Sequence, residues 1–117
     1  MQKLILTSRE ALSNPSVMVI DIEGVLDVYT AGDFETLLKD HFKNRRFKIV
    51  LNMKQLSYVS SAGFGVLMST IQDVRRNKGD IKIVNVSPDI YRVFDLFELP
   101  GLFHVLKTEQ DAVGEFQ

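Results

Sequence analysis

Apolar and polar residues alternate in some stretches of the chain and recur at steps of three and four positions in others. Alternation is typical of strands with one buried face, and the wider spacing is typical of amphipathic helices. We predict strands at 3–10, 17–24, 47–53, 80–86 and 102–107, and helices from Thr30 to about 43, from the Ser60–Ser61 junction to about 76, and from Ser87 to about 97. The last ten residues could add a terminal helical turn, which Gly114 weakens.

Helices separate most of the predicted strands. Strands connected in this way lie parallel in one sheet, because each crossover returns the chain to the same edge. The first two strands are joined only by the turn signal at 14–16, so we expect that pair to be antiparallel. The pattern predicts an α/β fold with a mixed, mostly parallel sheet of four to five strands and about four helices. No repeat or linker divides the chain, so residues 1–117 should form a single domain.

Each predicted helix has a start or stop signal and an apolar face. Thr30 and Asp33 resemble a capping box, Ser87 precedes a proline suited to the first helical position, and Gly79 should end the second helix. The residues expected on the buried faces are Phe34, Leu37, Leu38 and Phe42 in the first helix, Phe64, Leu67, Met68, Ile71 and Val74 in the second, and Ile90, Phe94 and Phe97 in the third.

The composition excludes or disfavours several functional classes. Hydrophobic residues make up 45% of the 117 residues and charged residues 25%, so the chain can bury a core without disulfides or metals. It has no cysteine, which excludes thiol chemistry and cysteine-bound zinc. A net charge of −1 disfavours direct binding to nucleic acid or anionic membranes. Without a signal peptide or a membrane-spanning run, we expect a cytoplasmic protein.

The junction YVSSAGFG, residues 58–65, is the main candidate for chemistry, because two serines and two glycines lie where a strand pattern changes to a helix pattern. The order of residues does not fit a nucleophile elbow, a dinucleotide-binding loop or a Walker motif. His41 and His104 are expected to be solvated or packed, and no spacing suggests a metal site. We therefore expect no catalytic residue, metal or cofactor. From spacing alone, Ser61 is better interpreted as a plain helix cap than as a chemical switch.

Asp27 lies in the loop between the second strand and the first helix. An isolated aspartate there is ordinarily a turn residue. However, this loop and the one with Ser60 and Ser61 both follow parallel strands, so both should lie at the carboxyl edge of the sheet, where sites in such folds are built. Asp27, Thr30 and the two serines are therefore expected to be neighbours in space.

Three segments together resemble the STAS domain family, and more narrowly its stand-alone anti-sigma factor antagonists. They are GVLDVYTAGDF, FKIVLNMKQLSYVSSAGFGVL and GDIKIVNVSPDIYRVFDLFEL, within a match that runs from Val17 to about Val105. In that family an anti-sigma factor, itself a serine kinase, phosphorylates a serine at the start of the second helix. By this resemblance Ser61 is the phosphorylated serine. Ser60 stands where the family usually has aspartate, which is a departure.

The resemblance implies a non-enzymatic regulator of transcription. The unmodified protein would bind an anti-sigma serine kinase and free a sigma factor, phosphorylation of Ser61 would end that binding, and a serine phosphatase would reset it. The residues expected to form the partner-binding surface are Asp27, Tyr29, Thr30, Ser60, Ser61, Gly63 and Phe64. One alternative is a STAS scaffolding subunit of a sensory or lipid-transport complex without a phosphorylation cycle. Another is a small nucleotide-binding protein, which rests only on the glycines at a helix start.

Overall fold

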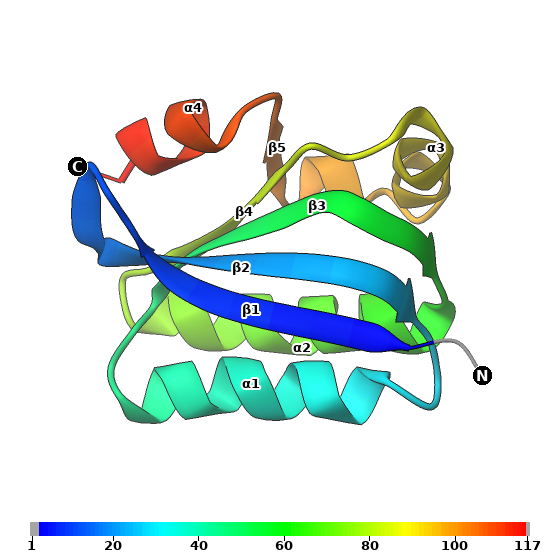
Figure 1. The fold of residues 1–117 in the computed structure, drawn as a ribbon, viewed down its shortest axis with the longest axis horizontal. Coiled ribbons are helices and arrows are strands. Elements are labelled where there is room, and N and C mark those ends of the chain that lie inside the picture. The colour runs from blue at the N-terminus through cyan, green and yellow to red at the C-terminus, as the bar shows by residue number, and fades with distance from the viewer. Residues whose placement is uncertain (1–2, 117) are drawn as a thin grey trace.

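A computed structural model describes residues 3–116 and shows one mixed sheet with helices on both faces (Figure 1). The elements are β1 (Leu4–Ala11), β2 (Asn14–Leu26), α1 (Ala31–Lys43), β3 (Lys48–Val59), α2 (Ser61–Arg76), β4 (Asp80–Val84), α3 (Pro88–Leu96), a 3₁₀ turn (Leu99–Gly101), β5 (His104–Leu106) and α4 (Glu109–Gly114). The strand order is β1-β2-β3-β4-β5, and only the β1–β2 pair is antiparallel. The predicted fold class is confirmed.

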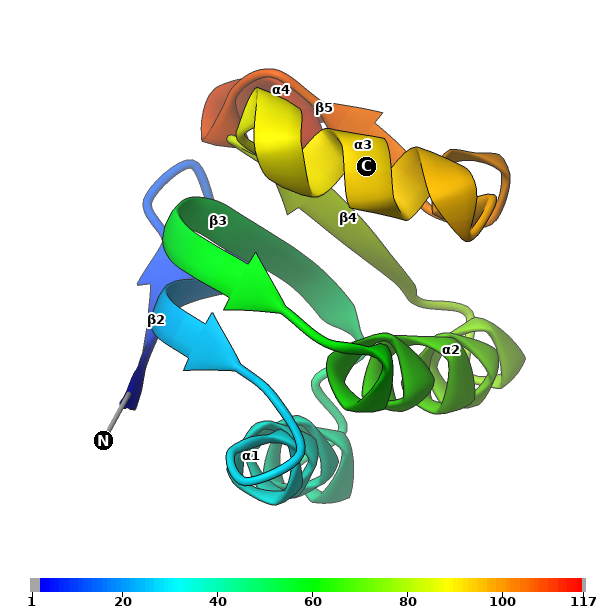
Figure 2. The ribbon, with the colours of Figure 1, turned by 90° about the vertical axis from the view of Figure 1, so that its right-hand side faces the viewer.

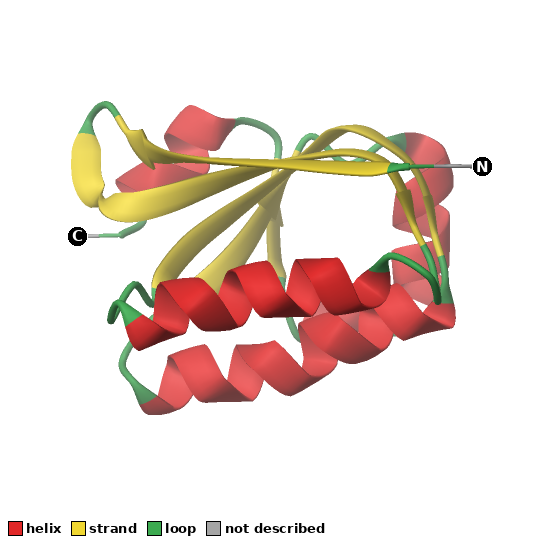
Figure 3. Cartoon of the chain, turned by 60° about the horizontal axis from the view of Figure 1, so that its bottom comes forward, coloured by secondary structure: helices red, strands yellow, loops and turns green. Residues whose placement is uncertain are grey.

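The first face of the sheet carries the main hydrophobic core. Alternate residues of β2 and β3, such as Ile20, Ile22, Leu51 and Met53, point to this face and are buried. Helices α1 and α2 lie side by side beneath it (Figure 3). Strands β2 and β3 are parallel, so both end at the same edge of the sheet. The chain enters α1 and α2 from that edge.

The second face is covered unevenly. Helix α4 packs over one end through Ala112 and Val113, against valines of β2, β3 and β4. Helix α3 lies at the other end, where Phe94 joins the main core and contacts the ring of Phe64 in α2 at a centroid distance of 5.3 Å. No helix of residues 3–116 is long and apolar enough to span a membrane.

Several strand boundaries differ from the sequence-based prediction, most of all those of β2 and β3. The link between β1 and β2 is the two-residue turn Leu12–Ser13, and the segment 14–16 belongs to β2. The Asn14 side chain explains this, because its Oδ1 accepts hydrogen bonds from Ser16 and its Nδ2 donates to the carbonyl of Phe116. Strands β2 and β3 also continue past their predicted ends, to Leu26 and Val59, through two register shifts in their pairing.

Two residues predicted on buried faces lie at the surface. Met68 is 49% exposed, and Phe97 is 52% exposed at the C-cap of α3. Thr70, which is not among the residues predicted for the apolar face of α2, is fully buried, and its hydroxyl is satisfied by donating to the Val66 carbonyl within α2 at 2.7 Å. Lys78, rather than Gly79, takes the left-handed conformation after α2. The other residues predicted on the buried faces are buried or partly buried.

Candidate functional site

The carboxyl ends of β2 and β3 form one edge of the sheet, which we call the rim. The Ser60 N–H donates to the Leu26 carbonyl at 2.8 Å, so the two strands stay joined up to the residue just before α2. Figure 2 faces this edge and shows α1 and α2 starting beside each other from the two strands. The expectation that the two loops meet at the carboxyl edge is confirmed.

Asp27 and Thr30 hold the β2–α1 loop together. Asp27 Oδ1 accepts hydrogen bonds from the backbone N–H groups of Tyr29 at 2.9 Å and Thr30 at 3.2 Å. The Thr30 hydroxyl donates to the Val25 carbonyl at 2.9 Å and accepts from the Asp27 N–H at 2.9 Å. These bonds leave no side-chain cap on α1, so the predicted capping box with Asp33 is wrong. The polar groups of Asp27 and Thr30 therefore form hydrogen bonds within the loop, and these bonds stabilise its conformation.

The two serines at the start of α2 have different environments. Ser60 occupies the N-cap position in extended conformation, and its Oγ is buried without a hydrogen-bond partner among the described residues. Ser61 is the first residue of the helix and is exposed. Neither hydroxyl caps the helix, although serine at an N-cap ordinarily accepts a bond from the first turn. Ser61 therefore has the hydroxyl that an enzyme could reach.

Gly63 and Phe64, which are expected on the partner-binding surface, lie inside the molecule. A Cβ on Gly63 would lie 2.7 Å from Cγ of Leu26, so α2 packs directly onto β2 at this point. Phe64 is 3% exposed and contacts the rings of Phe94, edge to face, and Phe97, at a tilt. Both residues position the start of α2, but neither presents a side chain at the surface.

Exposed apolar side chains lie on both elements that meet at the rim, the β2–α1 loop and the start of α2. Val28 and Tyr29 project from the β2–α1 loop, and Tyr29 is 89% exposed. Gly65 comes four residues after Ser61, and Met68 three residues after Gly65, which places all three on the same helix face. This group, Val28, Tyr29, Ser61, Gly65 and Met68, is the rim surface, and Phe97 adjoins it through Phe64. The sequence analysis did not predict Val28, Gly65 and Met68 as members of this surface. The spacing of seven residues between Ser61 and Met68, about two helical turns, could have indicated that Met68 shares the face of Ser61.

The histidines lie outside the rim surface. His41 hydrogen-bonds to Ser8 on β1, and His104 pairs with Glu115 next to α4. Neither bonds to Ser60 or Ser61 in the described part of the chain. Within residues 3–116, no group of three or more histidine, aspartate and glutamate side chains is placed to hold a metal ion. The rim thus offers a hydroxyl and an apolar surface, without a base beside the serine.

The fold and the rim together define a STAS domain. Residues 8–112 match the STAS domain family, and the chain belongs to this family.

Particular relatives resemble the chain over most of its length. The anti-sigma-B factor antagonist of Staphylococcus aureus strain NCTC 8325 is 31% identical over 86 residues, which are 74% of this chain and 80% of the relative. An anti-sigma factor antagonist from Mycobacterium paratuberculosis has the same fold, with a TM-score of 0.85, 19% identity, and coverage of 97% of this chain and 93% of that one. The Bacillus cell fate determinant SpoIIAA in its phosphorylated form superposes with a TM-score of 0.73 and 20% identity, covering 97% of this chain and 100% of that one.

Proposed function

We propose that this protein is an anti-sigma factor antagonist controlled by phosphorylation of Ser61. In its unmodified form it binds an anti-sigma factor that is a serine kinase, and this binding frees a sigma factor. Transfer of a phosphate to Ser61 ends the binding, and a serine phosphatase restores it. The protein acts by binding and catalyses no reaction itself.

The observation that carries the proposal is the exposed hydroxyl of Ser61 at the rim, together with exposed apolar side chains on the adjoining β2–α1 loop and on the same face of α2. Val28, Tyr29 and Met68 give the rim surface a size and hydrophobicity typical of the anchors of protein–protein interfaces. The rim surface lies on a stiff loop and a helix fixed by close packing, so it is preorganised for docking. The staphylococcal relative named an anti-sigma-B factor antagonist supports the choice of partner.

A phosphate on Ser61 is compatible with the folded state. The first turn of α2 has no acidic residue and no side-chain cap, so its N–H groups and the positive end of the helix dipole remain available to an anion. Phosphorylation adds about 1.5 to 2 negative charges at pH 7. We expect the modification to change docking at the rim and leave the fold intact.

A phosphate on Ser61 should prevent the kinase from binding because its charge lies within the docking surface. A partner that buries Val28, Tyr29 and Met68 must remove water from the phosphate between them. Burying a charge without a matching cation is costly, and a carboxylate on the partner would add repulsion of several kcal/mol. The switch therefore needs no movement of the backbone.

The test compares two aspartate variants in binding to the cognate anti-sigma kinase. Ser61→Asp should weaken binding by at least about tenfold, because it places a charge within the docking surface. Ser13→Asp is the matched control, since Ser13 is an exposed serine in the β1–β2 turn, far from the rim. Both variants should keep the wild-type circular dichroism spectrum. If Ser61→Asp bound as tightly as Ser13→Asp, the proposed switch would be wrong.

Phosphorylation itself separates this proposal from the scaffolding alternative. After incubation with the kinase and ATP, mass spectrometry should find phosphate on Ser61 and none on Ser60, whose Oγ is buried. Ser61→Ala should remove the modification. Protein from its native cell that lacks the phosphate and co-purifies with a transporter ATPase would instead favour a scaffolding subunit.

A further inference from the structure

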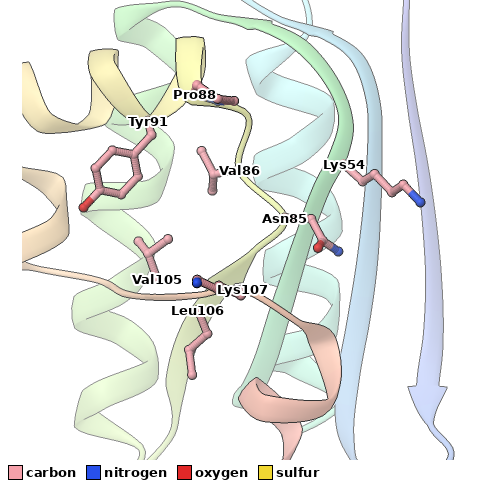
Figure 4. Close-up of a pocket in the computed structure, with 8 residues that line it drawn as sticks. All are labelled: Lys54, Asn85, Val86, Pro88, Tyr91, Val105, Leu106 and Lys107. Carbon is pink, nitrogen blue, oxygen red and sulfur yellow. The ribbon is translucent and has the colours of Figure 1, made fainter.

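A groove separate from the rim opens on the second face of the sheet, between the start of α3 and β5. Its volume is about 680 Å³, which lies in the range of small-molecule sites. The eight residues that line it are Lys54, Asn85, Val86, Pro88, Tyr91, Val105, Leu106 and Lys107 (Figure 4).

The body of the groove is apolar. Val86, Tyr91, Val105 and Leu106 come from the β4–α3 connection, α3 and β5, and each remains partly or fully accessible. In Figure 4 Val86, Tyr91 and Val105 lie around the space between α3 and β5, whereas Leu106 extends from β5 away from α3. An apolar hollow with partly open walls suits the hydrocarbon part of a ligand, because the ligand and the walls are then removed from water together.

The charge of the groove is one-sided. Its lining includes Lys54 and Lys107 and no acidic residue. Neither ammonium group takes part in an ion pair within residues 3–116, whereas Lys82 on neighbouring β4 pairs with both Asp80 and Glu115. Figure 4 shows the Lys107 nitrogen close to Val105 and Leu106, while Lys54 extends away across β2. Of these two lysines, Lys107 is therefore the one whose ammonium group can face a ligand in the groove.

Asn85 supplies a fixed polar group at the edge of the groove. It adopts a left-handed backbone conformation with φ 60°, which turns the chain from β4 toward α3. Its Nδ2 donates to Asn52 Oδ1 at 2.9 Å, and Asn52 donates in turn to Asp21 at 2.8 Å. This chain of bonds holds the amide in place. An amide nitrogen carries two hydrogens, so Asn85 can donate one further bond.

We propose that this groove binds a small amphipathic carboxylate. Its hydrocarbon body packs on Val86, Tyr91 and Val105, and its carboxylate lies beside Lys107 and Asn85. A single negative charge matches the one ammonium group that the groove presents. The proposal is independent of the switch at Ser61, because none of the lining residues belongs to the rim surface.

The test uses decanoate as the probe, below its micelle concentration, with ¹⁵N-labelled full-length protein. Saturable shifts should appear on the amides of Val86, Tyr91 and Val105. Decylammonium, with the same chain and the opposite charge, should bind at least about tenfold more weakly. Unsaturable shifts, shifts confined to other surfaces, or equal binding of decylammonium would each overturn the proposal.

A pair of variants tests the role of the cation. Lys107→Gln should weaken decanoate binding by about tenfold, since it removes the charge that faces the carboxylate. Lys3→Gln removes the same charge from an exposed lysine outside the groove and should leave the affinity unchanged. Equal affinities of the two variants for decanoate would contradict the assignment of Lys107.

Discussion

Ser60 and Ser61 are adjacent in sequence, yet one hydroxyl is sealed and the other faces solvent. The N–H of Ser60 is tied to Leu26 as the last bond between β2 and β3, which fixes its backbone in extended conformation. Ser61, one residue later, is already helical, so its side chain turns outward. The end of the β2–β3 pairing thus decides which serine can react.

The buried hydroxyl of Ser60 gives a prediction about stability. Ser60→Ala should leave the free energy of unfolding unchanged or raise it, because the lost Oγ makes no hydrogen bond that would offset the cost of its burial. An N-cap serine that does accept a bond ordinarily contributes about 1 kcal/mol. Urea unfolding of the variant and the wild type measures the difference.

Ser87 is the matched control for that measurement. Its Oγ accepts a hydrogen bond from the Ile90 N–H, so it caps α3 in the ordinary way. Ser87→Ala should lower the free energy of unfolding by about 1 kcal/mol. A loss of that size in Ser60→Ala as well would show that the Ser60 hydroxyl is bonded in solution.

Sequence reasoning at this scale succeeded for a residue that caps its own helix and failed where other bonds in the preceding loop or the pairing of strands decide the outcome. Ser87 caps its helix as predicted. Thr30 does not, because its hydroxyl is drawn into bonds with Val25 and Asp27 that the local pattern could not reveal. The different burial of Ser60 and Ser61 depended on the pairing of β2 with β3, which lies outside any local window.

At the scale of elements, the approach of α2 to the sheet depends on Gly63. The positions nearest to a Cβ on this residue are Leu26 Cγ at 2.7 Å and Val59 Cγ2 at 2.9 Å, both closer than side-chain carbons normally come. Gly65, two residues on, has nothing within 4 Å of the same position. The two glycines of one motif therefore have different roles, the first in packing and the second at the surface.

Alanine at each glycine should separate these roles. Gly63→Ala should be overpacked, at a cost of about 1–3 kcal/mol, partly offset by the better helix propensity of alanine. Gly65→Ala should gain about 0.5–1 kcal/mol, because only the propensity changes. Chemical denaturation should therefore rank Gly65→Ala above wild type and Gly63→Ala below it. Equal stability of the two variants would show that α2 is free to shift away from β2.

The order and type of the elements followed from periodicity, but their lengths did not. The predicted strand at 47–53 is the first half of β3, which continues to Val59 through a polar stretch containing Lys54 and Gln55. A register shift in the β2–β3 pairing lies at this point, and such a bulge interrupts the regular alternation of the two faces, so the neighbours Lys54 and Gln55 are both exposed. Met68 is exposed, contrary to the prediction, because it lies on the helix face that carries Ser61 rather than on the face that packs against the sheet.

For the whole molecule, stability should depend on pH through His41, which joins α1 to β1. Burial lowers the pKa of His41, and the nearby charge of Arg46 lowers it further, while Asp40 partly opposes the change. The unfolded chain therefore takes up this proton first as the pH falls. The contribution of His41 to folding is fully present above about pH 6.5 and is lost as the pH drops below that value.

Unfolding free energies at pH 7.5 and pH 5.5 measure this effect. The wild type should lose stability between the two values, and His41→Gln should lose less, because glutamine has no proton to gain. Other titrating groups contribute equally to both proteins, so the difference between them reports on His41. An equal loss in both proteins would show that His41 titrates alike in the folded and unfolded states.

The two ends of the described chain lie at opposite ends of the sheet, and this determines where a tag should be attached for binding measurements. Lys3 accepts a hydrogen bond from Val25 at the rim end, whereas the carbonyl of Phe116 is held by Asn14 beside the β1–β2 turn (Figure 1). An affinity tag or fluorescent fusion on the amino side would therefore lie at the rim end of the molecule, the end at which the partner of Ser61 docks. Attachment on the carboxyl side leaves that region open, so it is the better choice for immobilisation.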